Sequence, residues 1–132
     1  MKADLLYLGN SLSITDFAHS AEDAKNENPY NTSFSIFVVS GAFSGKGDCE
    51  YDIKDFRRFI SELQELYAFK RDTVELHDIC YGSYVVFRLH KTGEVDIHGT
   101  LYADGKEHSL TFTFYADQSA LPPFIKGLLQ LI

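Results

Sequence analysis

The sequence has few cysteines and no long apolar run. Two cysteines, Cys49 and Cys80, are too few for a disulfide framework, and we expect both to be buried small residues in a reducing compartment. A run of about 18 apolar residues, the length that a membrane-spanning helix needs, is absent, and so is an N-terminal leader with a small-residue cleavage site. We therefore expect a cytoplasmic protein that makes no contact with a membrane.

An excess of positive charge is also missing. The 132 residues include 19 Asp and Glu against 12 Lys and Arg, which gives a formal net charge of −7. This balance argues against a nucleic-acid-binding protein and favours association with a basic partner. The length fits one domain, residues 1–132, that buries its core without disulfides or metal ions.

No complete signature of an active site or a phosphate loop is present. Cys49 lies in "GKGDCEYD" between Asp48 and Glu50, whose charges would raise the pKa of its thiol, so we interpret it as structural. The same segment lacks the G-x-x-x-x-G-K-[ST] spacing of a phosphate loop. The segment "HDIC" supplies only half of a zinc ligand set. We expect no catalytic residue, no metal and no cofactor, and hence no enzyme.

Strand patterns occupy most of the chain. Residues 4–17 indicate two strands around a Gly9-Asn10 turn, whereas residues 18–32 are polar and predict a surface loop. The next strand carries apolar residues on both of its faces, which predicts a strand covered on both sides; a glycine-rich turn and a second strand follow. Its two faces are formed by Phe34, Ile36 and Val38 and by Phe37, Val39 and Phe43.

Two helices complete the pattern. From Asp52 to about Phe69 the apolar residues recur at helical spacing, and Asp52 is a suitable N-cap. The closing segment "DQSALPPFIKGLLQLI" starts a helix at Ser119 and its two prolines. We therefore expect an α+β fold: one antiparallel sheet or a two-sheet sandwich of about seven or eight strands, with one mid-chain helix and one C-terminal helix.

Turn chemistry predicts how the strands after residue 83 pair. A three-residue "KTG" loop with Gly93 in the left-handed region sets Leu89 opposite Val95 and Arg88 opposite Asp96. A two-residue Asp104-Gly105 turn then predicts three further pairs, and all apolar residues fall on one face. These pairs are Ile97 with Phe112, Gly99 with Leu110, and Val95 with Phe114.

The segment "RLHKTGEVDIHGT" carries two carboxylates and two imidazoles. Side chains at alternate strand positions could share a metal ion, yet the predicted register places the Arg88 cation beside Asp96, which opposes a second cation. The same cation lowers the pKa of Asp96 and makes it a poor general base. We favour the solvated outer face of a sheet, and we retain a metal-dependent hydrolase using His90, Asp96 and His98 as a less favoured alternative.

Aromatic and charged residues on predicted exposed surfaces are candidates for contact with another protein. Tyr and Arg often anchor protein interfaces, and acids at the rim speed the encounter with a basic partner. The candidates are Glu22, Asp23, Glu27, Tyr30, Asp48, Glu50, Tyr51, Tyr84, Arg88, Asp96, His98 and Tyr115.

Three motifs follow one another in about the last 80 residues. They are patterns of apolar and turn positions. A helix with a D-x-x-x-F pattern comes first, then a strand of the form G-x-V-x-[IV]-x-G, then "F-x-F-x-x-DQ-x-x-L" entering the final helix. This order resembles the WapI-type immunity proteins. The matching residues are Asp55, Phe59, Leu63, Gly93, Val95, Ile97, Gly99, Phe112, Phe114, Asp117, Gln118 and Leu121.

The resemblance implies a function. Proteins of this type are encoded beside bacterial polymorphic and contact-dependent inhibition toxins, and each neutralises one toxin domain, often a nuclease, by binding it. The expected partner is therefore a toxin C-terminal domain, whose basic cleft the acidic surface would cover. A β-rich domain that binds a small molecule or regulatory ligand in an apolar pocket is the alternative.

Overall fold

The computed structural model describes all residues from 1 to 132 and contains two four-stranded antiparallel sheets. Sheet A has the order β1-β2-β3-β4 and sheet B the order β5-β6-β7-β8. The strands are β1 Ala3–Tyr7, β2 Asn10–His19, β3 Thr32–Ser40, β4 Phe43–Tyr51, β5 Thr73–His77, β6 Tyr84–Leu89, β7 Glu94–Ala103 and β8 His108–Asp117. The helices are α1 Ala21–Lys25, α2 Ile53–Tyr67 and α3 Leu121–Leu131, the last preceded by a 3-10 turn, η1 Gln118–Ala120. The predicted α+β fold with two sheets, a mid-chain helix and a C-terminal helix is confirmed.

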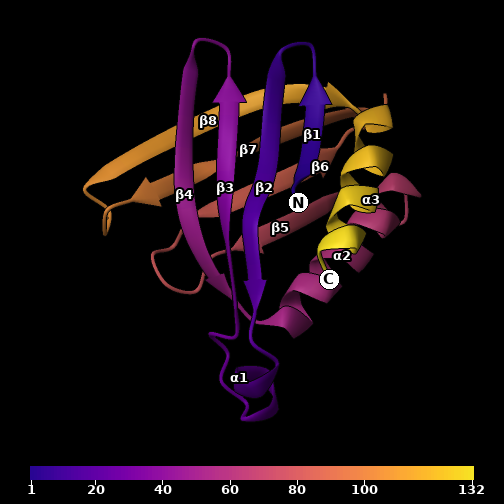
Figure 1. The fold of residues 1–132 in the computed structure, drawn as a ribbon. Coiled ribbons are helices and arrows are strands. Elements are labelled where there is room, and N and C mark those ends of the chain that lie inside the picture. The colour runs from indigo at the N-terminus through magenta and orange to yellow at the C-terminus, as the bar shows by residue number, and fades with distance from the viewer.

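The two sheets cross face to face, and α2 and α3 close one side of the space between them (Figure 1). Helix α3 packs against β1 and α2, and α2 packs against β5. One cluster of 31 buried residues from both sheets and both helices fills the interior. Apart from the short α1 between β2 and β3, the order of four strands followed by one long helix occurs twice. None of the helices combines the length and the apolarity that a membrane crossing requires.

Glycines allow the sheets to approach closely where β4 crosses β7 and β8. A β-carbon on Gly45 would lie 2.8 Å from Cδ2 of Leu110, and one on Gly47 would lie 3.1 Å from the carbonyl oxygen of Tyr102. The glycine-rich segment is thus a crossing point between layers, which agrees with our rejection of a phosphate loop.

Both predicted helices are confirmed. The Asp52 carboxylate accepts the backbone N–H of Lys54 at 3.0 Å and so caps α2. Asp117 accepts the N–H of Ser119 at 2.9 Å at the start of η1, and prolines occupy the first turn of α3, where a missing N–H does no harm.

The polar segment predicted as a loop contains a short helix. Ser20 caps α1 by accepting the N–H of Asp23 at 3.1 Å, and two acids occupy its first turn. The segment projects beyond the ends of β2 and β3 (Figure 1).

Strand β3 is covered on one face only, so the prediction of two covered faces is wrong. Phe34, Ile36 and Val38 are buried, whereas Phe37 is 39% exposed. Phe43 belongs to β4 and pairs with Ser40, so it lies on the side of the buried residues rather than beside Phe37 as predicted. Sheet B and the helices lie against the inner face of sheet A, and no element lies on its outer face (Figure 1).

The predicted register of β6 with β7 is confirmed, and that of β7 with β8 is wrong by two residues. Ile97 pairs with Phe114 and Gly99 with Phe112, because the hairpin loop has four residues rather than two. Asp104, Gly105 and Lys106 all have positive φ angles, and this left-handed run lengthens the loop. A shift by two residues keeps every side chain on its predicted face.

Candidate partner-binding surfaces

Several predicted candidates lie together on the outer face of sheet B. The register places Arg88 on β6, Asp96 on β7 and Tyr115 on β8 side by side. His98 lies opposite Val86, and Tyr84 lies at the start of β6. This face is a ladder of cross-strand polar pairs.

Asp96 is held on that face by two histidines. Its Oδ2 lies 2.7 Å from Nε2 of His90 and its Oδ1 lies 2.8 Å from Nδ1 of His98, and only 12% of the side chain is exposed. Burial acts to raise the pKa of Asp96, but the two histidine hydrogen bonds and the Arg88 charge outweigh it and bring the pKa below its ordinary value. The carboxylate is thus a structural acceptor and a weak base. No three His, Cys, Asp or Glu side chains converge on a point that a metal ion could occupy.

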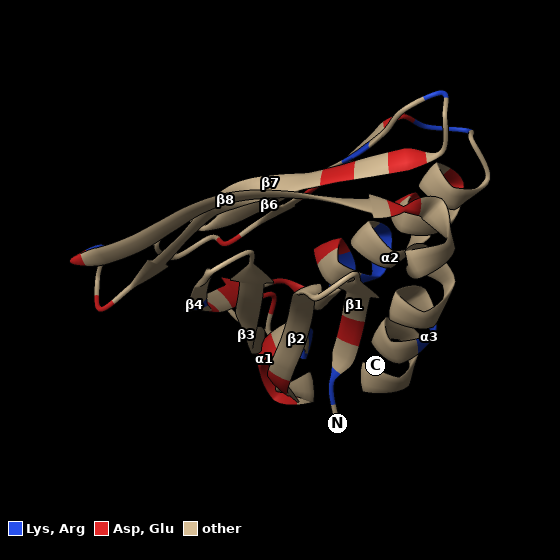
Figure 2. Ribbon diagram, turned by 90° about the horizontal axis from the view of Figure 1, so that it is seen from above, with Lys and Arg blue, Asp and Glu red and all other residues tan.

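A second group of candidates forms one acidic area at the α1 end of the molecule. Glu50 pairs with Ser33 and Asp48 with Ser35 on β3, and α1 lies beside this end of sheet A (Figure 2). We call this area the α1 acidic surface. It comprises Glu22, Asp23, Glu27, Tyr30, Asp48 and Glu50.

The α1 acidic surface contains a hollow of about 250 Å³. Asp23, Tyr30 and Glu50 line it together with His19. Burial and the nearby Asp78 carboxylate raise the pKa of Glu50. The hollow therefore presents carboxylates beside an exposed aromatic ring, a combination that suits the side chain of a Lys or Arg.

Tyr51 does not lie with the other candidates. Its side chain is buried in the core, with its ring 5.9 Å from that of Phe34 and 6.3 Å from that of Phe56, and burial raises its pKa to about 12. The predicted exposure of Tyr51 is wrong, because the side chain points to the inner face of β4.

The two cysteines differ in their exposure to solvent. Cys49 is buried, and its burial and the charges of Asp78, Asp48 and Glu50 raise its thiol pKa, as the sequence indicated. Cys80 is exposed, which corrects the prediction that it is buried.

The segment after β5 is held by Asp78, whose carboxylate accepts the N–H groups of Glu50, Cys80 and Tyr81 at 2.7–3.0 Å. Asp78 is a structural residue that sequence reasoning missed.

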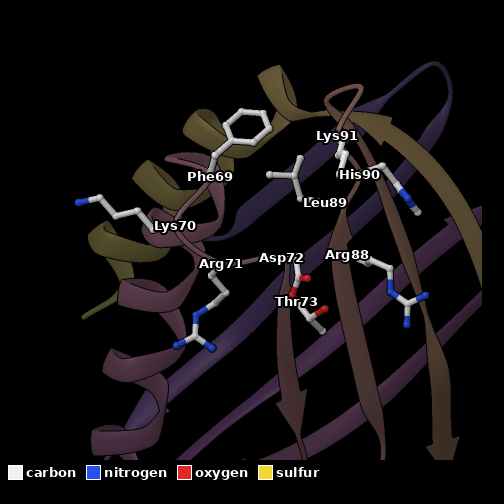
Figure 3. A pocket seen from close by; sticks show the side chains of 9 residues that line it. All are labelled: Phe69, Lys70, Arg71, Asp72, Thr73, Arg88, Leu89, His90 and Lys91. Atoms are coloured by element: carbon white, nitrogen blue, oxygen red, sulfur yellow. The ribbon is translucent and has the colours of Figure 1, made fainter.

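A cleft with a basic rim lies between the end of α2 and the β6–β7 turn (Figure 3). It has a volume of about 680 Å³ and is formed by two segments, residues 69–73 and 88–91. Lys70 and Arg88 point away from each other (Figure 3), and Arg71 pairs with Glu62 at 3.2 Å. The cations therefore do not converge on a single anion position.

Comparison with known proteins assigns the family. The model of the "Immunity protein WapI-like family" matches residues 9–132. The chain belongs to this WapI-like immunity protein family. The match extends well beyond the C-terminal residues that carry the sequence resemblance, and it includes the α1 acidic surface. A search of the curated proteins finds no match.

One solved structure with a related fold is that of the MRP1/MRP2 proteins of Trypanosoma brucei. It has a TM-score of 0.52 and 11% sequence identity, and the similarity covers 99% of this chain and 81% of that one. At this identity the likeness is one of fold alone.

The G-x-V-x-[IV]-x-G motif of this WapI-like immunity protein stabilises the fold. Gly93 has a φ of 89° in the β6–β7 turn, and its carbonyl accepts the N–H of Gln118 at 2.9 Å. A β-carbon on Gly99 would collide with the carbonyl oxygen of Tyr84. Val95 and Ile97 are buried in the core. The motif residues therefore specify the sandwich and leave the partner-binding residues unassigned.

Proposed function

We propose that this chain is an immunity protein that binds one bacterial toxin domain and blocks its active site. It acts without enzymatic chemistry, in the cytoplasm of a bacterium that uses contact-dependent inhibition toxins. The observation that carries the proposal is the family match over residues 9–132. The net charge of −7 and the α1 acidic surface support it.

The proposed mechanism is electrostatic and steric occlusion. A nuclease toxin has a cleft lined with Lys and Arg that holds phosphates, and carboxylates compete for the same cations. The α1 acidic surface covers this cleft, with Asp23 and Glu50 opposite its cations and Tyr30 beside them. Complementary charge accelerates the encounter, and shape complementarity slows dissociation.

The core contradicts a ligand pocket between the two sheets. The 31 residues of the buried cluster fill the space that such a pocket would need. The basic cleft and the hollow beside α1 lie on the surface instead.

Co-expression tests the proposal. The toxin C-terminal domain encoded immediately upstream of this chain's gene is expressed alone and together with the chain. We expect growth arrest in the first case and growth in the second, together with a stable complex on size-exclusion chromatography. Growth arrest in both cases would refute the proposal. An Asp23→Lys, Glu50→Lys double variant should lose protection, whereas Glu107→Lys, in the β7–β8 loop, should keep it.

A further inference from the structure

Sheet A has an outer face that no other element covers (Figure 1). Ser35, Phe37 and Val39 of β3 lie on this face, since they alternate with the buried Phe34, Ile36 and Val38. The register places Phe37 between Ser13 of β2 and Lys46 of β4. We call this surface the Phe37 face.

The neighbours of Phe37 on this face are two serines with satisfied hydroxyls, Ser13 and Ser35, and the longer side chain of Lys46. The hydroxyl of Ser13 donates to Asp4 at 2.6 Å, and that of Ser35 donates to Asp48 at 2.8 Å. Because these hydroxyls already have protein partners, covering the face with another protein does not leave them unpaired. Phe37 is 39% exposed among these neighbours, so part of its phenyl ring is available to a partner as an anchor.

Further apolar side chains lie where the Phe37 face meets the β1–β2 turn. Leu8 is 85% exposed and has a φ of 48°, a conformation that leucine adopts at an energetic cost. The N–H of Gly41 donates to Oδ1 of Asn10 at 2.9 Å and ties the two turns together. Leu6 of β1 is 63% exposed and pairs with Ser11 of β2, which places it on the Phe37 face next to the first turn. Leu6 and Leu8 thus present apolar surface to solvent at this end of the face.

The opposite end of the Phe37 face is acidic. Asp48 and Glu50 lie on the same side of β4 as Lys46, and they belong to the α1 acidic surface. The outer face of sheet A therefore carries carboxylates at its α1 end, Lys46 beside Phe37, and the exposed Leu6 and Leu8 toward the β1–β2 turn. This arrangement fits a partner that has a cationic cleft beside an apolar hollow.

We infer that the toxin domain docks on the Phe37 face, with Phe37 as the central anchor. The inference rests on the proposed function and adds to it the surface that binds the toxin domain. The toxin places an apolar hollow over Phe37 and its cationic cleft over Asp48 and Glu50. The outer face of sheet B stays in solvent. A second copy of the chain is a poor occupant, because two molecules of net charge −7 repel each other.

Calorimetric titration of the upstream-encoded toxin domain tests the inference. Phe37→Ala should raise the Kd at least about 30-fold, the effect of a central aromatic anchor. Leu6→Ala, in the neighbouring row of the face, should raise it about threefold. The matched control is Tyr115→Ala, since Tyr115 is an exposed aromatic residue on the outer face of sheet B. This control should leave the Kd unchanged. Thermal unfolding of each free variant verifies that it is folded.

Each outcome decides the inference. If the unaltered chain neither binds the toxin domain nor protects cells, the proposed function fails and the inference falls with it. If the unaltered chain binds and a folded Phe37→Ala variant binds equally well, the inference alone is overturned. A dimer of the free chain that Phe37→Ala dissociates would assign the face to a second copy and would likewise overturn it.

Discussion

Single residues at points of close backbone approach set much of the stability of this fold. Gly99 of β7 has no room for a β-carbon because the carbonyl oxygen of Tyr84 occupies the space, and backbone atoms do not yield easily. We expect Gly99→Ala to lower the free energy of unfolding by about 3 kcal/mol in urea denaturation. Gly45→Ala is the control, and it should lose about 1 kcal/mol or less, because its neighbour is the flexible side chain of Leu110. Equal losses in the two variants would contradict this account.

The ionised Asp96 side chain makes the free energy of unfolding depend on pH. We expect Asp96→Asn to lower the free energy of unfolding by about 1–2 kcal/mol at neutral pH, because a charged acceptor of two hydrogen bonds is lost. The pKa of Asp96 in the folded state lies below its ordinary value of 3.8, so its contribution is complete above that pH. The contribution disappears as pH falls through the folded-state value.

Denaturant unfolding of the unaltered chain and the Asp96→Asn variant at a series of pH values checks this expectation. The difference between them should shrink as the pH falls below about 4. Asp104→Asn, in the exposed β7–β8 loop, is the control and should change stability by less than about 0.5 kcal/mol. A difference that grows as the pH falls below about 4 would disprove the assignment.

Leu8 occupies a turn position that favours Asn or Gly. Leu8 and Gly9 both have positive φ angles, of 48° and 83°, as in the tight turns that suit a two-residue hairpin. We expect Leu8→Asn to raise the free energy of unfolding by about 0.5–1 kcal/mol in urea denaturation, because Asn tolerates the left-handed region. A loss of stability would show that the leucine side chain stabilises the fold in a way that its exposure does not suggest.

At the scale of elements, one buried side chain joins the loop between α1 and β3 to the start of α2. Oδ1 of Asn31 accepts the N–H of Ile53 at 2.8 Å, and its Nδ2 donates to the carbonyl of Asn28 at 2.9 Å and to Asp52 at 3.2 Å. We expect Asn31→Ala to lower the free energy of unfolding by about 2–3 kcal/mol, because the first N–H of α2 loses its partner. Asn26→Ala, at the exposed end of α1, should change it by less than about 0.5 kcal/mol. A similar small effect of both changes would show that the junction does not depend on Asn31.

The sequence predicted those elements whose determinants are local. The cap at Asp52, the prolines of α3 and the left-handed Gly93 are all readable from neighbouring residues, and each prediction holds. Helix α1 was also readable in principle, because Ser20 followed three residues later by Asp23 is a cap signal. The β7–β8 loop was not, since "DG" favours a two-residue turn and nothing local indicates that Lys106 is left-handed as well.

Features that depend on distant parts of the chain could not be predicted. The pattern of β3 is the same whether its second face is covered or exposed, and only the absence of a layer over the outer face makes Phe37 an exposed residue. The α1 acidic surface unites residues 22–30 with residues 48–50. The sequence indicated candidate residues in both segments but not that the segments lie together. The two segments of the basic cleft carry no shared motif, so their proximity is a property of the fold alone.

For the whole molecule, the net charge of −7 should govern the rate of association with the toxin. We expect the association rate constant to fall about tenfold or more between about 20 mM and 500 mM NaCl, because salt screens the attraction between unlike charges. The dissociation rate constant should change little. Stopped-flow fluorescence measures both. An association rate constant independent of salt would contradict an electrostatic encounter, whereas the inference about Phe37 would stand.

The contact between α3 and β1 determines when the fold is completed during synthesis. Gly127 of α3 lies so near β1 that a β-carbon on it would be 3.0 Å from Cα of Ala3. Strand β1 is synthesised before every other strand, but α3, which packs against it, is synthesised after all of them. We expect that β1 lacks this cover through most of translation, and that the nascent chain is exposed to proteases and to misassociation until α3 docks. Under the proposed function, we expect protection against the toxin to depend on the supply of completed chains rather than on the rate at which new ones are begun.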